Sequence, residues 1–145
     1  MKYLQVIVYT CLLTFFMSPA FSFAEPNHDV SFLINNGKCP KPEELGKATS
    51  KQELAKALNI IIPKVYKGEK YTEWKIEQIV PLIESPDPEA YYGMGKYYCG
   101  EKVAKNSWYV EVLFPKYLPA YDASHGQIFV TKNKEGKWFA WFKFH

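Results

Sequence analysis

Arginine is absent from this chain of 145 residues, so all 18 of its basic residues are lysines. Arginine is the side chain that grips phosphate, carboxylate and guanine in a bidentate manner. The formal net charge is only +3, whereas a nucleic-acid-binding domain normally shows a clustered basic face. We therefore expect no nucleic-acid partner.

Histidine and cysteine are also scarce, with three residues of each type. The histidines stand far apart at His28, His125 and His145, which leaves a zinc site without enough ligands. The chain has no glycine-rich phosphate loop and no internal repeat. We expect no metal and no other cofactor.

Only the N-terminus has a long apolar run. Lys2 precedes an apolar stretch over residues 4–17, and the small residues Ser22 and Ala24 follow it. This pattern is typical of a secretory signal peptide cleaved after Ala24. An uncleaved membrane anchor is the alternative, but the stretch is shorter than the roughly 20 residues that a span needs.

The sequence thus divides into a signal peptide at 1–24, an extended N-terminal segment at 25–49 and one α+β domain at 50–145. We expect a protein that is secreted, extracellular or held in the cell envelope, without a membrane span in the mature chain.

Cleavage would remove Cys11 and leave Cys39 and Cys99. An even pair of cysteines in an exported protein normally forms a disulfide bond, and closing a loop of about 60 residues contributes roughly 4 kcal/mol in the chain-entropy model. The alternative is that Cys99 is a catalytic thiol. That role needs a nearby base, and no histidine stands close to Cys99 in the sequence.

The clearest helix signal follows residue 49. Ser50 and Glu53 fit a capping box, and apolar residues then recur at helical spacing. Pro63 should kink this helix rather than end it, because the apolar pattern continues to Tyr66. The apolar residues of the repeat are Leu54, Leu58, Ile61 and Val65.

Alternating apolar residues predict strands at 74–82, 108–114, 127–132 and 138–144, with a hairpin loop at 133–137. The alternation in the first strand is interrupted at Gln78. A short helix is expected over 88–98, with Asp87 as its N-cap and Gly100 at its end. The fold class is therefore α+β, with an N-terminal helix packed on a curved antiparallel sheet of about four strands and one disulfide bond.

The last predicted strand is apolar on both sides. Strict alternation places Phe139 and Trp141 on one side, opposite Trp138, Ala140, Phe142 and Phe144. One side can pack on the helix that begins after Ser50. The other side must face a second internal core, a ligand cleft or a docking surface.

Aromatic residues are the best candidates for function. Tyrosines suit sugar rings, peptides and protein interfaces, although packing around the disulfide bond is the alternative use of this cluster. The sequence predicts an exported, non-catalytic binding or interaction module for an extracellular protein, peptide or glycan. The candidate ligand-binding residues are Tyr91, Tyr92, Tyr98, Phe139 and Trp141.

A small secreted hydrolase is the alternative function, with His125 as its base. Asp122 and Ser124 lie beside His125 in a predicted connection between strands. Neighbouring loop residues do not by themselves form a triad, whose members must converge in space. We therefore predict no catalytic residues.

A helix followed by an antiparallel sheet that wraps it, across residues 50–144, resembles the cystatin-like and NTF2-like architectures. The stretches Cys99–Gly100, Ser107–Val110 and Gly126–Lys132 are also similar to small exported proteins of uncharacterised function from low-GC Gram-positive bacteria. True cystatins inhibit cysteine proteases through a Gln-x-Val-x-Gly loop. This chain lacks that motif, so the resemblance implies a fold but no protease inhibition.

Overall fold

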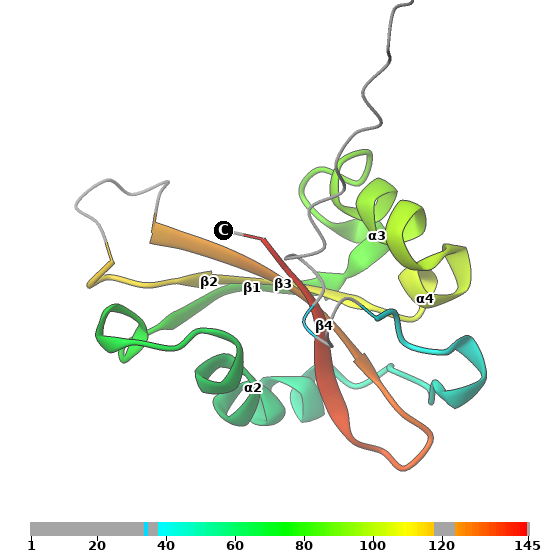
Figure 1. Cartoon of the computed structure of the whole chain (residues 1–145), viewed down its shortest axis with the longest axis horizontal. Coiled ribbons are helices and arrows are strands. Elements are labelled where there is room, and N and C mark those ends of the chain that lie inside the picture. The colour runs from blue at the N-terminus through cyan, green and yellow to red at the C-terminus, as the bar shows by residue number, and fades with distance from the viewer. Residues whose placement is uncertain (1–33, 35–37, 118–123, 145) are drawn as a thin grey trace, which may run out of the picture.

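The computed structural model describes residue 34 and residues 38–117 and 124–144, which include a four-stranded antiparallel sheet (Figure 1). The predicted signal peptide lies outside the described residues. The strands are adjacent in chain order, so β1 and β4 are the two edges of the sheet. They are β1 (Lys75–Pro81), β2 (Trp108–Leu113), β3 (His125–Lys132) and β4 (Trp138–Phe144).

Helices cover both faces of this sheet. Helix α2 (Lys51–Val65) lies on one side, and α3 (Tyr91–Cys99) and α4 (Glu101–Lys105) lie on the other (Figure 1). The predicted α+β class is confirmed, and α4 is an addition that the sequence pattern did not indicate. Short 3-10 helices are η2 (Pro42–Glu44), η3 (Glu69–Tyr71) and η4 (Leu82–Glu84).

Helix α2 begins where the capping signal predicts. The Glu53 backbone N–H donates to Ser50 Oγ at 3.2 Å, which satisfies one of the free amides at the helix start. The Glu53 carboxylate does not complete a capping box but accepts from Lys132 Nζ at 2.6 Å. Helix α2 continues through Pro63 to Val65, so this proline does not end it.

Helix α2 packs its apolar stripe against the sheet to form the first core. Side chains of alternate residues in β2 and β3 point to α2, as expected when successive residues of a strand face opposite sides. The buried residues contributed by helix and sheet include Leu54, Leu58, Ile61, Ile62, Val110, Val112, Ile128 and Val130.

A bulge in β4 changes the expected sidedness of this strand. Phe129 of β3 pairs with Phe142, and the next residue, Val130, pairs with Ala140. Trp141 is therefore the extra residue, and bulges of this kind redirect side chains. Phe142 consequently lies on the same side as Trp141, which corrects the simple alternation expected for residues 138–144.

A second bulge explains the interruption at Gln78 in β1. Ile76 pairs with Val112 and Gln78 with Glu111, so that Glu77 is the extra residue. Ile76 and Ile79 consequently both pack in the first core.

The other face of the sheet is a second internal core. Trp141, which the sequence placed among candidate binding residues, is fully buried there. Helices α3 and α4 and the η4 turn supply the cover, and the close approach of α3 uses Gly95, whose added Cβ would lie 2.9 Å from Leu82. The buried residues of this core are Leu82, Val103, Ala104, Tyr109, Phe129, Trp141 and Phe142.

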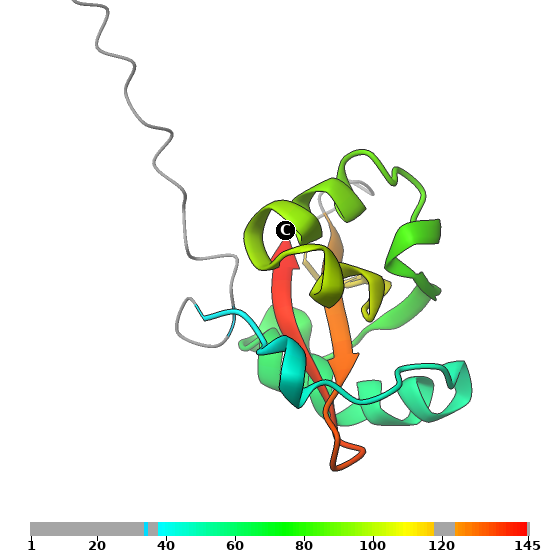
Figure 2. The same cartoon turned by 90° about the vertical axis from the view of Figure 1, so that its right-hand side faces the viewer.

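The predicted disulfide bond is present between Cys39 and Cys99, 60 residues apart in sequence. Since both sulfurs are used in this bond, Cys99 is not a free thiol. The segment that carries Cys39 then runs past the β3–β4 hairpin (Figure 2), where Leu45 forms an antiparallel bridge with Asn133. Within the described part of the chain, none of the helices has the length and apolar character to cross a membrane.

Candidate functional site

An apolar groove lies between helix α2 and the edge strand β4. Its volume is about 470 Å³, within the range of roughly 300–1,000 Å³ typical of small-molecule sites. Ile60 is 62 % exposed, although it is a large apolar residue. We call this site the α2–β4 groove; it is lined by Ile34, Ala57, Ile60, Ile61, Lys64, Val65, Gly136, Lys137, Trp138, Phe139 and Ala140.

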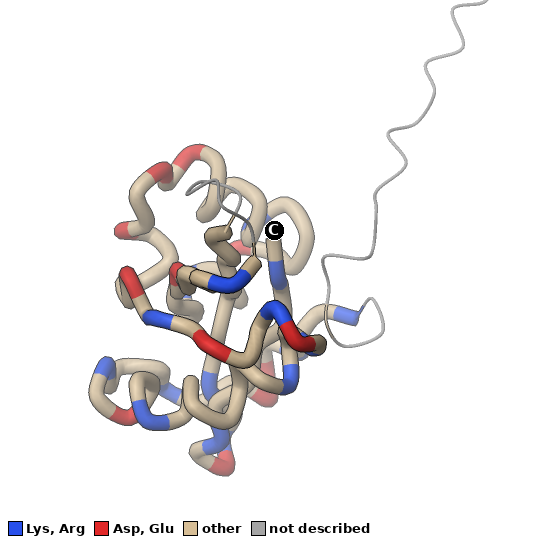
Figure 3. The backbone as a smooth tube through the Cα atoms, turned by 90° about the vertical axis from the view of Figure 1, so that its left-hand side faces the viewer, with Lys and Arg blue, Asp and Glu red and all other residues tan. Residues whose placement is uncertain are grey.

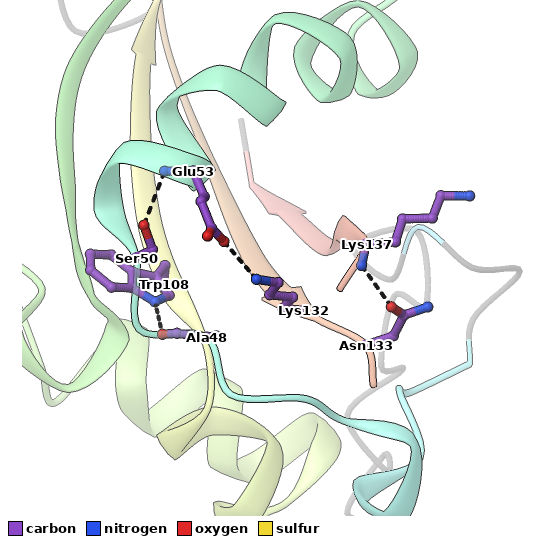
Figure 4. A network of polar contacts seen from close by, with 7 residues as sticks. All are labelled: Ala48, Ser50, Glu53, Trp108, Lys132, Asn133 and Lys137. Atoms are coloured by element: carbon purple, nitrogen blue, oxygen red, sulfur yellow. Dashed lines mark hydrogen bonds and ion pairs between the residues drawn. The ribbon is translucent and has the colours of Figure 1, made fainter. Parts of the chain in front are cut away.

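A polar network fixes the N-terminal end of α2 to the β3–β4 hairpin (Figure 4). Glu53 of the helix accepts from Lys132 of β3, and the Lys132 ammonium lowers the pKa of this carboxyl below its usual value. The hairpin itself is held by Asn133, whose side chain accepts from the Lys137 backbone N–H at 2.8 Å. The two walls of the groove are thus joined at this end.

Tyr66 fixes the other end of α2. Its hydroxyl lies 3.3 Å from the backbone oxygen of Gln127 and 3.4 Å from that of Phe144. The ring rests over Gly126, where an added Cβ would lie 2.5 Å from the Tyr66 hydroxyl oxygen. Because both ends of α2 are attached to the sheet, the α2–β4 groove is formed before any ligand arrives.

The same contacts show that α2 and β4 run in the same direction. Glu53, near the start of α2, contacts Lys132, which pairs with Trp138 at the start of β4. Tyr66, after the end of α2, contacts Phe144 at the end of β4. Lys137 therefore lies at one end of the groove and Lys64 lies toward the other.

The charged residues that line the groove are both cationic. Lys64 and Lys137 are the only ionisable residues among its lining residues, and neither forms an ion pair with another described residue. Lysines and acidic residues are distributed over the rest of the backbone, as the view in Figure 3 shows. The groove thus combines an apolar lining with two lysines that form no ion pair within the described part of the chain.

The tyrosines predicted from the sequence lie on α3, on the opposite face of the sheet from α2. Tyr91 packs its ring on Tyr109, with centroids 4.7 Å apart, and Tyr98 packs on Phe142 at 5.5 Å. Both residues are half-buried and cover the second core. Tyr92 packs against this core as well, and it also lines a nearly flat depression of about 670 Å³ together with Tyr97.

The two remaining candidates of the sequence analysis lie on β4 and pack in the same second core. Phe139 also borders the α2–β4 groove. Trp141 is buried, and its indole N–H donates to Ser107 Oγ at 3.0 Å, so it lines no surface. All five predicted residues thus belong to the second core or to the residues packed against it.

The residues of the alternative hydrolase are only partly described. His125 is the first residue of β3, opposite Leu113 of β2. Ser124 is buried, and its backbone oxygen accepts from Phe114 N–H at 2.8 Å. Asp122 lies outside the described residues. Among the residues that the structure describes, no group of three or more histidine, cysteine or acidic side chains is placed to hold a metal ion.

Sequence reasoning missed Ile60, Lys64 and Lys137. A signal for Ile60 was present, since the chain has three successive isoleucines at 60–62. Successive residues of a helix point about 100° apart, so three in a row cannot all face one core. Comparisons with protein-family models, with curated proteins and with solved structures find no match for this chain.

Proposed function

We propose that this protein is an exported, non-catalytic binding module that holds a small apolar ligand in the α2–β4 groove. The observation that carries the proposal is the exposure of Ile60 on the wall of a preformed groove. Export is supported by the predicted signal peptide and by the Cys39–Cys99 bond, because disulfide bonds persist in oxidising compartments.

The energy available from such binding is substantial. Covering an isoleucine side chain completely contributes about 1.5–3 kcal/mol. Ala57, Val65 and Trp138 extend the same apolar surface along the groove. A rigid groove also avoids the cost of ordering loops when the ligand binds.

Titration with the neutral fluorophore N-phenylnaphthylamine tests the proposal. We expect saturable binding at one site, with fluorescence enhancement as the probe leaves water. Ile60→Asp should weaken binding about tenfold, because it removes about 1.4 kcal/mol of apolar contact. Since Ile60 is exposed, the thermal melt of this variant should stay close to that of the wild-type protein.

Ile83→Asp is the matched control. Ile83 is also an exposed isoleucine, at 49 %, but it lies in η4, whose Leu82 packs in the second core on the opposite face of the sheet from α2. This variant should bind the fluorophore as the wild-type protein does. Absence of saturable binding, or equal loss in both variants, would contradict the proposed site.

A further inference from the structure

The two walls of the α2–β4 groove set the length of ligand that it can hold. The helix wall from Ala57 to Val65 extends about 12 Å at 1.5 Å per residue. The opposite wall consists of Gly136 and Lys137 of the hairpin loop and of the strand residues Trp138 to Ala140, which extend about 7 Å at 3.3 Å per residue. Both walls are mainly aliphatic or aromatic and run alongside each other. A linear apolar chain can lie along the helix wall over this length.

Charge distinguishes the two ends of the groove. Lys64 lies in the last turn of α2, and the sequence from Ile60 to Gly68 contains no acidic residue. Lys137 lies in a turn that also contains Glu135, whose carboxylate offsets part of its positive charge. Of the two lining lysines, Lys64 is therefore the one whose charge no neighbouring carboxylate in the sequence offsets.

Strand addition by a peptide is disfavoured at the edge of β4. An extended peptide binds an exposed edge through backbone hydrogen bonds. At Trp141 the backbone oxygen already accepts from Ile34 N–H at 3.0 Å, and Ile34 also lines the groove. A peptide running along β4 would have to displace this contact, whereas a slender chain lying between β4 and α2 would not.

We infer that the ligand of the α2–β4 groove is a single-chain amphiphile with one carboxylate, whose alkyl chain lies along Ile60 and Trp138 and whose head group lies beside Lys64. This inference rests on the proposed function, since it specifies the chemistry of the ligand in that groove. It goes further by assigning an anion-binding role to Lys64.

Calorimetric titration with decanoate and with decanol, at neutral pH and below micellar concentrations, tests the inference. Decanoate should bind about fivefold more tightly than decanol, the equivalent of the roughly 1 kcal/mol of an exposed ion pair. Added salt should reduce this preference, because it screens exposed charges. Decanol affinity should depend far less on salt.

Lys64→Gln should remove the preference for decanoate and leave decanol binding unchanged. Lys137→Gln is the matched control at the other end of the groove and should retain the preference. Loss of the preference in Lys137→Gln rather than in Lys64→Gln would overturn the assignment of the head group. Equal affinity of the wild-type protein for both compounds would overturn the carboxylate inference while leaving the apolar site in place.

Failure of the proposed function gives a different result. In that case neither decanol nor decanoate would bind, and Ile60→Asp would have no effect. Sedimentation of the protein with anionic phospholipid vesicles, but not with neutral ones, would identify a membrane surface as the occupant and overturn the inference. A groove-dependent dimer, abolished by Ile60→Asp, would identify a second copy of the chain and overturn it as well.

Discussion

Trp141 links the β4 bulge to the helices that cover the second core. Its indole N–H donates to Ser107 Oγ, and the Ser107 hydroxyl donates in turn to the backbone oxygen of Val103 at 2.8 Å. The indole also packs against Phe129, with ring centroids 5.5 Å apart. A single side chain therefore combines apolar burial with a buried hydrogen bond, and both depend on the bulge that turns it inward.

Replacing Trp141 should accordingly affect stability. We expect Trp141→Ala to lower the free energy of unfolding by about 3–5 kcal/mol, because a large buried side chain is lost and a cavity remains. Trp141→Phe should cost less, since most of the apolar volume stays. Urea denaturation measures both values, and a loss below about 1 kcal/mol in Trp141→Ala would contradict a core position.

At the scale of elements, the sheet edges differ in how they are protected. Edge strands with free backbone groups invite pairing with other chains. Strand β1 has a bulge at Glu77 and ends at Pro81, and both features disfavour further strand pairing. Strand β4 is contacted by Ile34 on its outer side, and the α2–β4 groove lies along it.

The attachment of α2 to β4 has a consequence for alkaline stability. Burial raises the pKa of the Tyr66 hydroxyl well above its usual value. Its contribution is therefore complete below the unfolded-state pKa of about 10, and is lost as the pH rises from there toward the folded-state pKa. Above this pH the unfolded chain is stabilised by releasing the Tyr66 proton, whereas the folded protein keeps the proton, so the free energy of unfolding falls.

Tyr66→Phe should make this dependence visible. Near neutral pH the variant should lose about 0.5–1.5 kcal/mol of unfolding free energy with its hydroxyl contacts. The difference from the wild-type protein should shrink as the pH rises above about 10, because phenylalanine cannot ionise. Urea denaturation at a series of alkaline pH values gives the test, and parallel curves for the two proteins would reject the role of Tyr66.

The elements with local signals were the ones that the sequence predicted. Ser50 and Gly100 mark helix ends by their own chemistry, and both do so in the structure. Asp87 also caps a turn, since its carboxylate accepts from Ala90 N–H at 3.0 Å, although α3 begins only at Tyr91. The bulges at Glu77 and Trp141 could not be located, because a bulge is a mismatch between two strands.

The candidate site was less predictable for the same reason. The groove combines α2 with β4, which are about 70 residues apart in the sequence, and only packing brings Lys64 and Lys137 to one site. Aromatic composition favoured Trp141 instead. Composition identifies side chains that are usually buried, but it does not indicate whether they are buried in the core of the protein or covered by a ligand.

At the scale of the whole molecule, one sheet separates two cores. The first lies under α2 and the second under α3 and α4. The disulfide bond lies on the side of the second core, where Cys99 ends α3 and Cys39 belongs to the segment before α2. It therefore connects the cover of the second core to the chain that leads into the first.

Removing this bond should destabilise the whole fold. The double variant Cys39→Ser, Cys99→Ser should lose up to about 4 kcal/mol of unfolding free energy, the value expected for a loop of about 60 residues. Thermal melts with and without reductant measure the effect. Reductant should lower the melting temperature of the wild-type protein and not that of the double variant; an unchanged wild-type melt would contradict a stabilising role.

The bond between Cys39 and Cys99 also makes a closed covalent ring that contains α2, β1 and α3. A protease that cuts one peptide bond within this ring opens it without releasing a fragment, since the two new pieces remain joined through sulfur. The residues between α2 and β1 include Gly68 and Glu69, which are exposed, and exposed loops are the preferred sites of proteolytic nicking. In oxidising surroundings a molecule nicked there stays in one piece, and its fragments separate only when the disulfide bond is reduced.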